Sequence, residues 1–124
     1  MQVSLKGTNI QILESTREYV DRKLVHTAEK FFKPARQFAG GDGDDLVSLA
    51  IEVEKTTKHH KKGDIFRAEA SLSMGKINLR AESTAETLNN AIDEVEYELM
   101  REIKKFKEKR RALLLKGARK VKGK

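Results

Sequence analysis

A dense run of basic residues, MREIKKFKEKRR, extends from Met100 to Arg111. Seven of its twelve residues are Lys or Arg, and only two are Glu. Guanidinium and ammonium groups bind phosphates, and an exposed aromatic ring such as that of Tyr97 can stack on an unpaired base. The run therefore predicts a nucleic-acid surface. The alternative interpretation is a solvated helix with acids early and bases late, an order that the helix dipole favours.

Residues suited to catalysis or metal binding form no recognisable pattern. The sequence has no Cys, which excludes disulfides, thiolate nucleophiles and Cys-based zinc sites. It also lacks a P-loop, a GxGxxG motif and a Ser-His-Asp arrangement in a suitable context. His59 and His60 stand among lysines that would repel a metal cation. We therefore expect no enzyme activity, no metal, no cofactor and no small-molecule substrate.

The segment FAGGDGDD, from Phe38 to Asp45, contains a GxxG pattern of the kind that KH domains place against an RNA backbone. Its aspartates would repel phosphates, and they lack the ligand spacing of an EF-hand. We interpret this segment as a loop.

Charge is distributed unevenly along the 124 residues. Residues 1–100 contain 14 Lys and Arg against 17 Asp and Glu, whereas residues 101–124 contain 12 against 2. The net charge of +7 is therefore a property of the C-terminal part, which is typical of contact with a nucleic acid or another anionic surface. No apolar run approaches the length of a membrane span, and the first residues do not resemble a signal peptide. We expect a cytoplasmic protein with no membrane partner.

The first half of the chain predicts a strand followed by a helix. Residues 2–6 alternate between apolar and polar, and Gly7 is expected to close this strand. A helix is expected over residues 15–32, where Ser15 and Glu18 have the form of a capping box, and Pro34 should stop it. Its core stripe comprises Thr16, Val20, Leu24, Ala28 and Phe31.

The second half predicts three alternating strands and a long helix. Strands begin at about residues 46, 66 and 76, and their short connections indicate an antiparallel meander. Their inward residues are Val47, Leu49, Ile51 and Val53, then Phe66, Ala68, Ala70 and Leu72, then Ile77, Leu79 and Ala81. A helix follows from about Thr84 to about Arg110, because apolar residues recur there every three or four positions.

The resulting order, β-α-β-β-β-α, predicts an α+β fold in which two helices cover one face of a four-stranded sheet. The opposite face should be polar and open. It would carry Glu52, Arg67, Glu69, Lys76 and Arg80. We expect one domain over residues 1–110 and a flexible basic tail over residues 111–124.

The long helix should present its cations away from the sheet. At 100° per residue, Arg101 lies about 180° from Ile92, with Lys104 and Lys105 flanking it and Tyr97 one turn earlier. Two further basic surfaces are expected, one on the first helix and one in the connection over residues 55–62. The first-helix surface comprises Arg22, Lys23, His26 and Lys30. Three such surfaces favour a large folded polyanion, and ribosomal RNA over duplex DNA because no recognition helix or zinc finger is present.

Several strings, in this order and spacing, resemble the short-form ribosome hibernation factors, the family of ribosome-associated inhibitor and hibernation-promoting proteins once labelled sigma-54 modulation proteins. They are FRAEASLSMG and LRAEST, which are similar to the family's central strands, and LNNAIDEVEYELMREIKKFKEK, which is similar to its second helix. The resemblance covers residues 2–109. The triplet Thr87-Leu88-Asn89 departs from the acidic-Met-Tyr pattern of that helix.

The resemblance implies a fold similar to a double-stranded-RNA-binding domain. It also implies binding to the small ribosomal subunit, in the channel for messenger and transfer RNA, and inhibition of translation during dormancy or stress. The chain would lack the C-terminal dimerisation domain of long-form members. The expected RNA-binding residues are Lys23, Arg80, Tyr97, Arg101, Lys104, Lys105, Lys107, Lys109 and Arg110.

Two alternatives stay open at the level of sequence. One is a module that binds a structured RNA outside the ribosome. The other is a signalling protein whose basic tail binds an acidic protein partner.

Overall fold

The computed structural model describes residues 1–30, 47–56 and 65–122, and over residues 114–122 it describes the helical backbone alone. Four strands form one sheet in the order β1-β2-β3-β4. Their bounds are Gln2–Thr8 for β1, Val47–Thr56 for β2, Ile65–Met74 for β3 and Ile77–Ala85 for β4. The strands β2, β3 and β4 are antiparallel neighbours, whereas β1 pairs with β2 in parallel.

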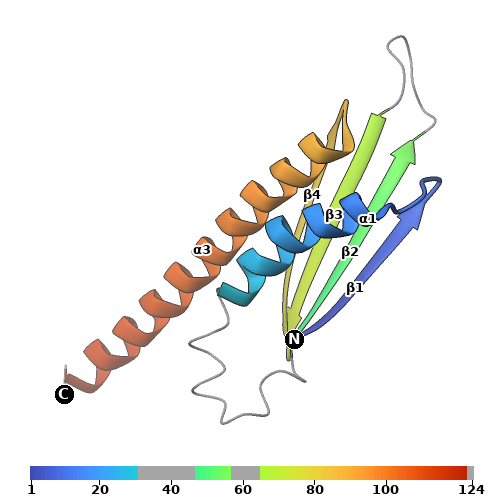
Figure 1. Cartoon of the computed structure of the whole chain (residues 1–124). Coiled ribbons are helices and arrows are strands. Elements are labelled where there is room, and N and C mark those ends of the chain that lie inside the picture. Colours follow the sequence, from blue (N-terminus) through green and yellow to red (C-terminus); the bar gives the residue numbers. More distant parts are fainter. Residues whose placement is uncertain (31–46, 57–64, 123–124) are drawn as a thin grey trace.

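Both helical segments lie on the same face of this sheet (Figure 1). The first begins as α1 (Glu14–Val20), continues through a π-helical turn, η1 (Asp21–Val25), and remains helical over residues 26–30. The second is the long helix α3 (Leu88–Lys122), which packs on β4 and β3. The predicted α+β fold, with two helices on one face of a four-stranded sheet, is confirmed.

The core forms where the alternating strands face these helices. The inward residues of β2 are all buried, and in β3 the buried side chains are Ala68, Ala70 and Leu72. Alanines at the centre of the sheet let α3 approach closely, so Ile92, Val95 and Leu99 are completely buried. Burial of each large aliphatic side chain stabilises the fold by about 1.5–3 kcal/mol. The predicted inward faces of β2 and β3 are confirmed at these positions.

The connection from β1 to α1 differs from the prediction. Strand β1 continues through Gly7 to Thr8, and a Cβ at Gly7 would lie 2.9 Å from Ile12 Cγ1. The chain then turns at Asn9, whose φ of 57° is left-handed, and α1 begins at Glu14. The predicted capping box is wrong, because Leu13 is the N-cap and no side chain caps this end. Ser15 therefore lies inside the first turn rather than in front of it.

The first helical segment contains one turn that periodicity did not predict. In η1 the backbone N–H of His26 donates to the carbonyl of Asp21, five residues earlier. The wider turn lets the neighbouring residues Leu24 and Val25 both enter the core. Lys23 lies within this turn and contacts α3 through Asp93 and Glu96.

The bounds of α3 also differ from the prediction at both ends. Residues Thr84 and Ala85 belong to β4, where they pair with Arg67 and Phe66. Thr87 then caps the helix, because its Oγ1 accepts a hydrogen bond of 3.1 Å from the backbone N–H of Asn90. At the other end α3 continues to Lys122, so the predicted end at about Arg110 is wrong. The division into a domain of residues 1–110 and a flexible tail of residues 111–124 stays a prediction.

Candidate nucleic-acid interface

The charges of α3 change sign along its length. Its first half carries Asp93, Glu94, Glu96 and Glu98, whereas the residues from Arg101 to Arg111 include seven cations and two glutamates. Negative charge near the N-terminus and positive charge near the C-terminus both suit the helix dipole. The dipole acts mainly within the terminal turns, however, and Arg101 lies near the middle of a 35-residue helix. The central cations therefore need another explanation.

Packing directs three of these cations into solvent. Leu99 and Ile103 are buried against the sheet, and this orientation places Arg101, Lys104 and Lys105 on the exposed side of α3. We call these three residues the basic face. Their predicted outward orientation is confirmed.

Two members of the basic face form ion pairs within α3. Arg101 Nη1 lies 3.1 Å from Glu98 Oε1, and Lys105 Nζ lies 3.5 Å from Glu102 Oε2. Both pairs join residues that are three positions apart in the helix. Exposed pairs of this kind contribute about 0.2–1 kcal/mol, so a phosphate can replace the carboxylate at little cost. Lys104 has no ion pair within the described part of the chain.

Lys23 lies apart from the basic face, at the junction between the first helical segment and α3. Its Nζ is 3.6 Å from Asp93 and 3.9 Å from Glu96, and it lies over the ring of Tyr19. The Tyr19 hydroxyl donates a hydrogen bond of 2.5 Å to Asp93, and this bond raises the pKa of Tyr19 to about 12. We call Tyr19, Lys23, Asp93 and Glu96 the helix clasp. Its geometry assigns Lys23 a role in joining two helices.

Tyr97 is exposed, as predicted, with 64% of its surface accessible. It lines a small hollow together with the carboxylates Asp93, Glu94 and Glu98. These carboxylates would repel the phosphates of a nucleotide stacked on the ring. The structure therefore does not surround Tyr97 with cations, and a role for it in RNA binding stays a prediction.

Arg80 lies on the open face of the sheet, which the strands separate from the basic face of α3. Its guanidinium pairs with Glu69 and Glu82, and the neighbouring Arg67 contacts four carboxylates. Those of Glu52, Glu54, Glu69 and Glu82 lie 3.3, 3.4, 2.8 and 2.5 Å from Arg67. The hydrogen bond from Arg67 holds the pKa of Glu82 below its usual value. This face is polar and open, as predicted, but its arginines are already neutralised.

The remaining predicted residues continue along α3. Lys107, Lys109 and Arg110 are all exposed. Lys109 and Arg110 also line a groove between α3 and the beginning of β4. Sequence periodicity did not reveal this groove, because it combines residues from two elements. The only signal was the apolar residue Leu113 among cations.

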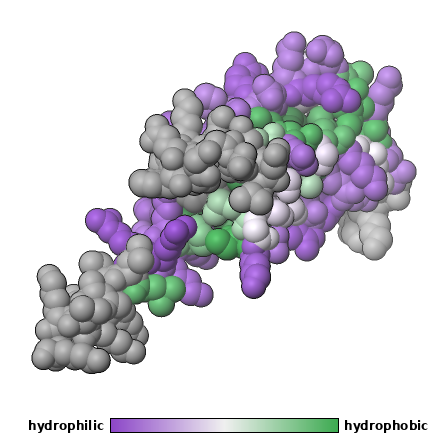
Figure 2. Space-filling view, turned by 90° about the horizontal axis from the view of Figure 1, so that it is seen from below, coloured by the Kyte–Doolittle hydropathy of each residue, from purple (hydrophilic) through white to green (hydrophobic). Residues whose placement is uncertain are grey.

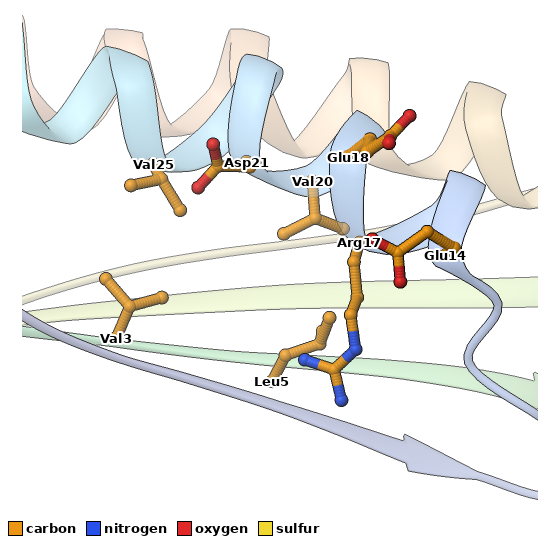
Figure 3. Close-up of a pocket in the computed structure, with 8 residues that line it drawn as sticks. All are labelled: Val3, Leu5, Glu14, Arg17, Glu18, Val20, Asp21 and Val25. Carbon is orange, nitrogen blue, oxygen red and sulfur yellow. The ribbon is translucent and has the colours of Figure 1, made fainter.

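Other expected surfaces contribute less. The GxxG loop and residues 57–64 of the basic connection lie outside the described residues. Figure 3 shows a hollow between β1 and the first helical segment, in which the Arg17 side chain extends towards Leu5 and Glu14 lies beside it. Glu18 and Asp21 also line this hollow. This acidic lining does not suit a phosphate. Among the described residues, no group of side chains could hold a metal ion, and no helix is long and apolar enough to cross a membrane.

The structure defines a small α+β protein in which helices cover one face of a four-stranded sheet and one long helix carries a concentrated basic region. Such a concentration of cations is typical of proteins that contact a polyanion. A sequence profile of the family described as Sigma 54 modulation protein / S30EA ribosomal protein matches residues 3–111. The chain belongs to this family.

Three relatives illustrate the similarity. The chain is 32% identical over 109 residues to a ribosome hibernation promotion factor from Picosynechococcus, covering 88% of this chain and 50% of the relative. It is 28% identical over 114 residues to a ribosome hibernation promoting factor from Pseudomonas putida, and the match covers 92% of this chain and 94% of the relative. The N-terminal domain of Protein Y from Thermus thermophilus has a similar fold, with a TM-score of 0.62 and 23% identity. The match covers 86% of this chain and 99% of that domain. The chain thus spans about half the length of some curated relatives and nearly all of another.

Proposed function

We propose that this protein is a ribosome hibernation factor of the cytoplasm, which binds the small ribosomal subunit and inhibits translation. Membership of the family and the names of the relatives support this proposal. The observation that supports the binding mode is the basic face, because its three cations are exposed while Ile92, Val95, Leu99 and Ile103 pack α3 against the sheet. Ribosomal RNA offers a dense array of phosphates to such a surface.

We further propose that the protein occupies the channel for messenger and transfer RNA. A ligand of that channel must be compact, and it must meet RNA through charge and shape rather than through a groove-reading helix. About six phosphate contacts would give a slope of log K against log salt of −4 to −5. The paired arginines of the open sheet face make that side the less favourable one for RNA.

The first experiment reverses the charge of the basic face by combining Arg101→Glu, Lys104→Glu and Lys105→Glu in one variant. We expect co-sedimentation with small subunits to be lost at physiological salt, because phosphate contacts become repulsions. The matched control reverses the charge at Lys6, Arg17 and Lys76, which are exposed on other parts of the molecule. Both variants change the net charge by the same amount. Retained binding by the first variant would show that this surface is not the interface.

The second experiment tests the channel. Small subunits carrying bound messenger and transfer RNA should no longer bind the protein, whereas empty subunits should. Equal binding to both would exclude the channel. If the protein instead binds isolated structured RNA as tightly as it binds subunits, the ribosome is not its specific target.

A further inference from the structure

A groove of about 680 Å³ lies between α3 and the first residues of β4. Its floor is apolar and comes from two elements: Ile77 and Leu79 from β4, and Phe106 and Leu113 from α3. Leu113 is 62% exposed, which is unusual for a leucine beside so many charges. Figure 2 shows hydrophobic atoms at the surface, beside hydrophilic ones, where α3 leaves the rest of the domain.

The rim of the groove is basic. Lys105, Lys109 and Arg110 line it, together with the single carboxylate of Glu102, which pairs with Lys105. The groove therefore combines an apolar floor with three cations, of which Lys105 pairs with Glu102 and Lys109 and Arg110 form no ion pair with any described residue.

Lys105 belongs both to the basic face and to this rim. The groove is thus continuous with the surface that the proposed function assigns to RNA. A polynucleotide that contacts the basic face can follow the helix to Lys109 without crossing any of the carboxylates in the first half of α3. Only Glu102 and Glu108 oppose the cations over this stretch.

We propose that the groove binds a nucleobase from an unpaired segment of RNA, with the adjoining phosphates on Lys105 and Lys109. Single strands are bound in this way, by a charged groove that follows the backbone and by apolar or aromatic side chains that receive the bases. Arg110 can contact the sugar–phosphate on the opposite side of the groove. The proposal rests on the proposed function, which it extends by assigning a subsite for single-stranded RNA.

An acidic peptide is the competing occupant, because a basic rim and an apolar floor would suit it too. Continuity with the basic face favours RNA. A polynucleotide supplies one phosphate per residue along the row of cations, whereas a peptide needs carboxylates at matching positions. Phe106 also contributes an aromatic ring to the groove. A nucleobase gains more binding energy from such a ring than an aliphatic side chain of a peptide would.

The test compares two labelled probes of about ten residues, oligouridylate and an abasic phosphodiester of the same length. Fluorescence anisotropy of the full chain should show binding that is about five- to tenfold tighter for oligouridylate, with equal salt slopes. Leu113→Ser should remove this preference without changing the salt slope. Lys109→Gln should lower the slope by about 0.7 and keep the preference.

Two control variants locate the base. Met100→Ser removes another exposed apolar side chain of α3, 54% accessible, and should keep the preference. Tyr97→Ala should keep it too. Loss of the preference in the Tyr97 variant would move the base to that ring and overturn the proposal.

The proposal is also overturned if the wild-type chain binds both probes equally. An acidic peptide of alternating Glu and Leu that displaces oligouridylate only when Leu113 is present would identify a protein occupant instead. These outcomes are independent of ribosome binding. Failure of co-sedimentation with subunits, combined with a preserved base preference, would reject the proposed function and retain the groove.

Discussion

The helix clasp shows that cations of similar appearance in the sequence can have different roles. Lys23 and Lys104 are both lysines on helices of a basic protein. In the folded chain Lys23 lies against Asp93 and Glu96, whereas Lys104 is exposed without an ion pair among the described residues. A mutation at Lys23 is therefore expected to act first on the fold, and a mutation at Lys104 first on binding.

Tyr19 provides the pH-dependent prediction at this scale. Its hydrogen bond to Asp93 is expected to stabilise the fold by about 1 kcal/mol, so Tyr19→Phe should lower the free energy of unfolding by that amount at neutral pH. Because the pKa of Tyr19 is raised in the folded state, this contribution is complete below about pH 10 and is lost as the pH rises to about 12. Urea unfolding of both proteins at neutral pH and on either side of pH 12 measures the difference.

Tyr97→Phe is the control, because Tyr97 is exposed and forms no hydrogen bond within the described residues. It should leave the free energy of unfolding unchanged at neutral pH. Identical pH dependence of the wild-type and Tyr19→Phe proteins would contradict the assigned role of the phenol.

At the scale of elements, the turn between β1 and α1 depends on the absence of a side chain at Gly7. A Cβ there would lie 2.9 Å from Ile12 Cγ1 and 3.0 Å from the carbonyl of Ile10. We expect Gly7→Ala to lower the free energy of unfolding by about 1–3 kcal/mol, through overpacking. Chemical denaturation of the wild-type and Gly7→Ala proteins measures this change in the free energy of unfolding.

A second substitution distinguishes overpacking from backbone strain. Gly75 has a φ of 60° and no heavy atom near its potential Cβ, so Gly75→Ala should destabilise through the backbone alone. Adding Ile12→Ala should recover part of the loss in the Gly7→Ala background and none in the Gly75→Ala background. Equal recovery in both would reject the contact as the cause.

Strand faces could be predicted from the sequence, because a pleated strand must alternate its side chains. This alternation alone predicts that Leu49 and Ile51 face the core, and both are buried. The parallel pairing of β1 and the π-helical turn could not be predicted, since both depend on contacts between distant segments. The predicted start of α3 at about Thr84 is too early, because Thr84 belongs to β4 and pairs with Arg67 of β3.

The same limit applies to the candidate interface. The outward direction of Arg101 and Lys104 follows from the helical period once Ile92 is placed in the core. The full neutralisation of Arg80 does not follow, because Glu69 comes from the neighbouring strand β3. The acidic surroundings of Tyr97 do follow from the helical period, since Asp93 and Glu94 lie one turn earlier on the same helix. Charge counted along the chain predicts a basic protein, but only the fold shows which cations are already paired.

At the scale of the whole molecule, the two sides differ in electrostatic character. The open sheet face balances its arginines with carboxylates, and the far half of α3 concentrates the excess positive charge. A molecule charged in this way should meet a polyanion with α3 first.

Deletion of residues 112–124 tests how this charge is used. Among the residues of α3 whose side chains the structure describes, Ile103 is the last buried one, so the free energy of unfolding should change by less than about 0.5 kcal/mol. Affinity for small subunits should fall, because five cations are removed, but the basic face should preserve binding. Denaturation and co-sedimentation measure the two effects. Complete loss of binding would favour a partner that recognises the tail.

The parallel pairing of β1 with β2 has a consequence for synthesis. Gln2 pairs with Ser48, so β1 leaves the translating ribosome 46 residues before its partner does. At about 5–20 residues per second, β1 waits for about 2–9 s before the sheet can form. During this interval its apolar side chains are without their neighbours, and the short length of the strand limits the chance that another chain pairs with it first.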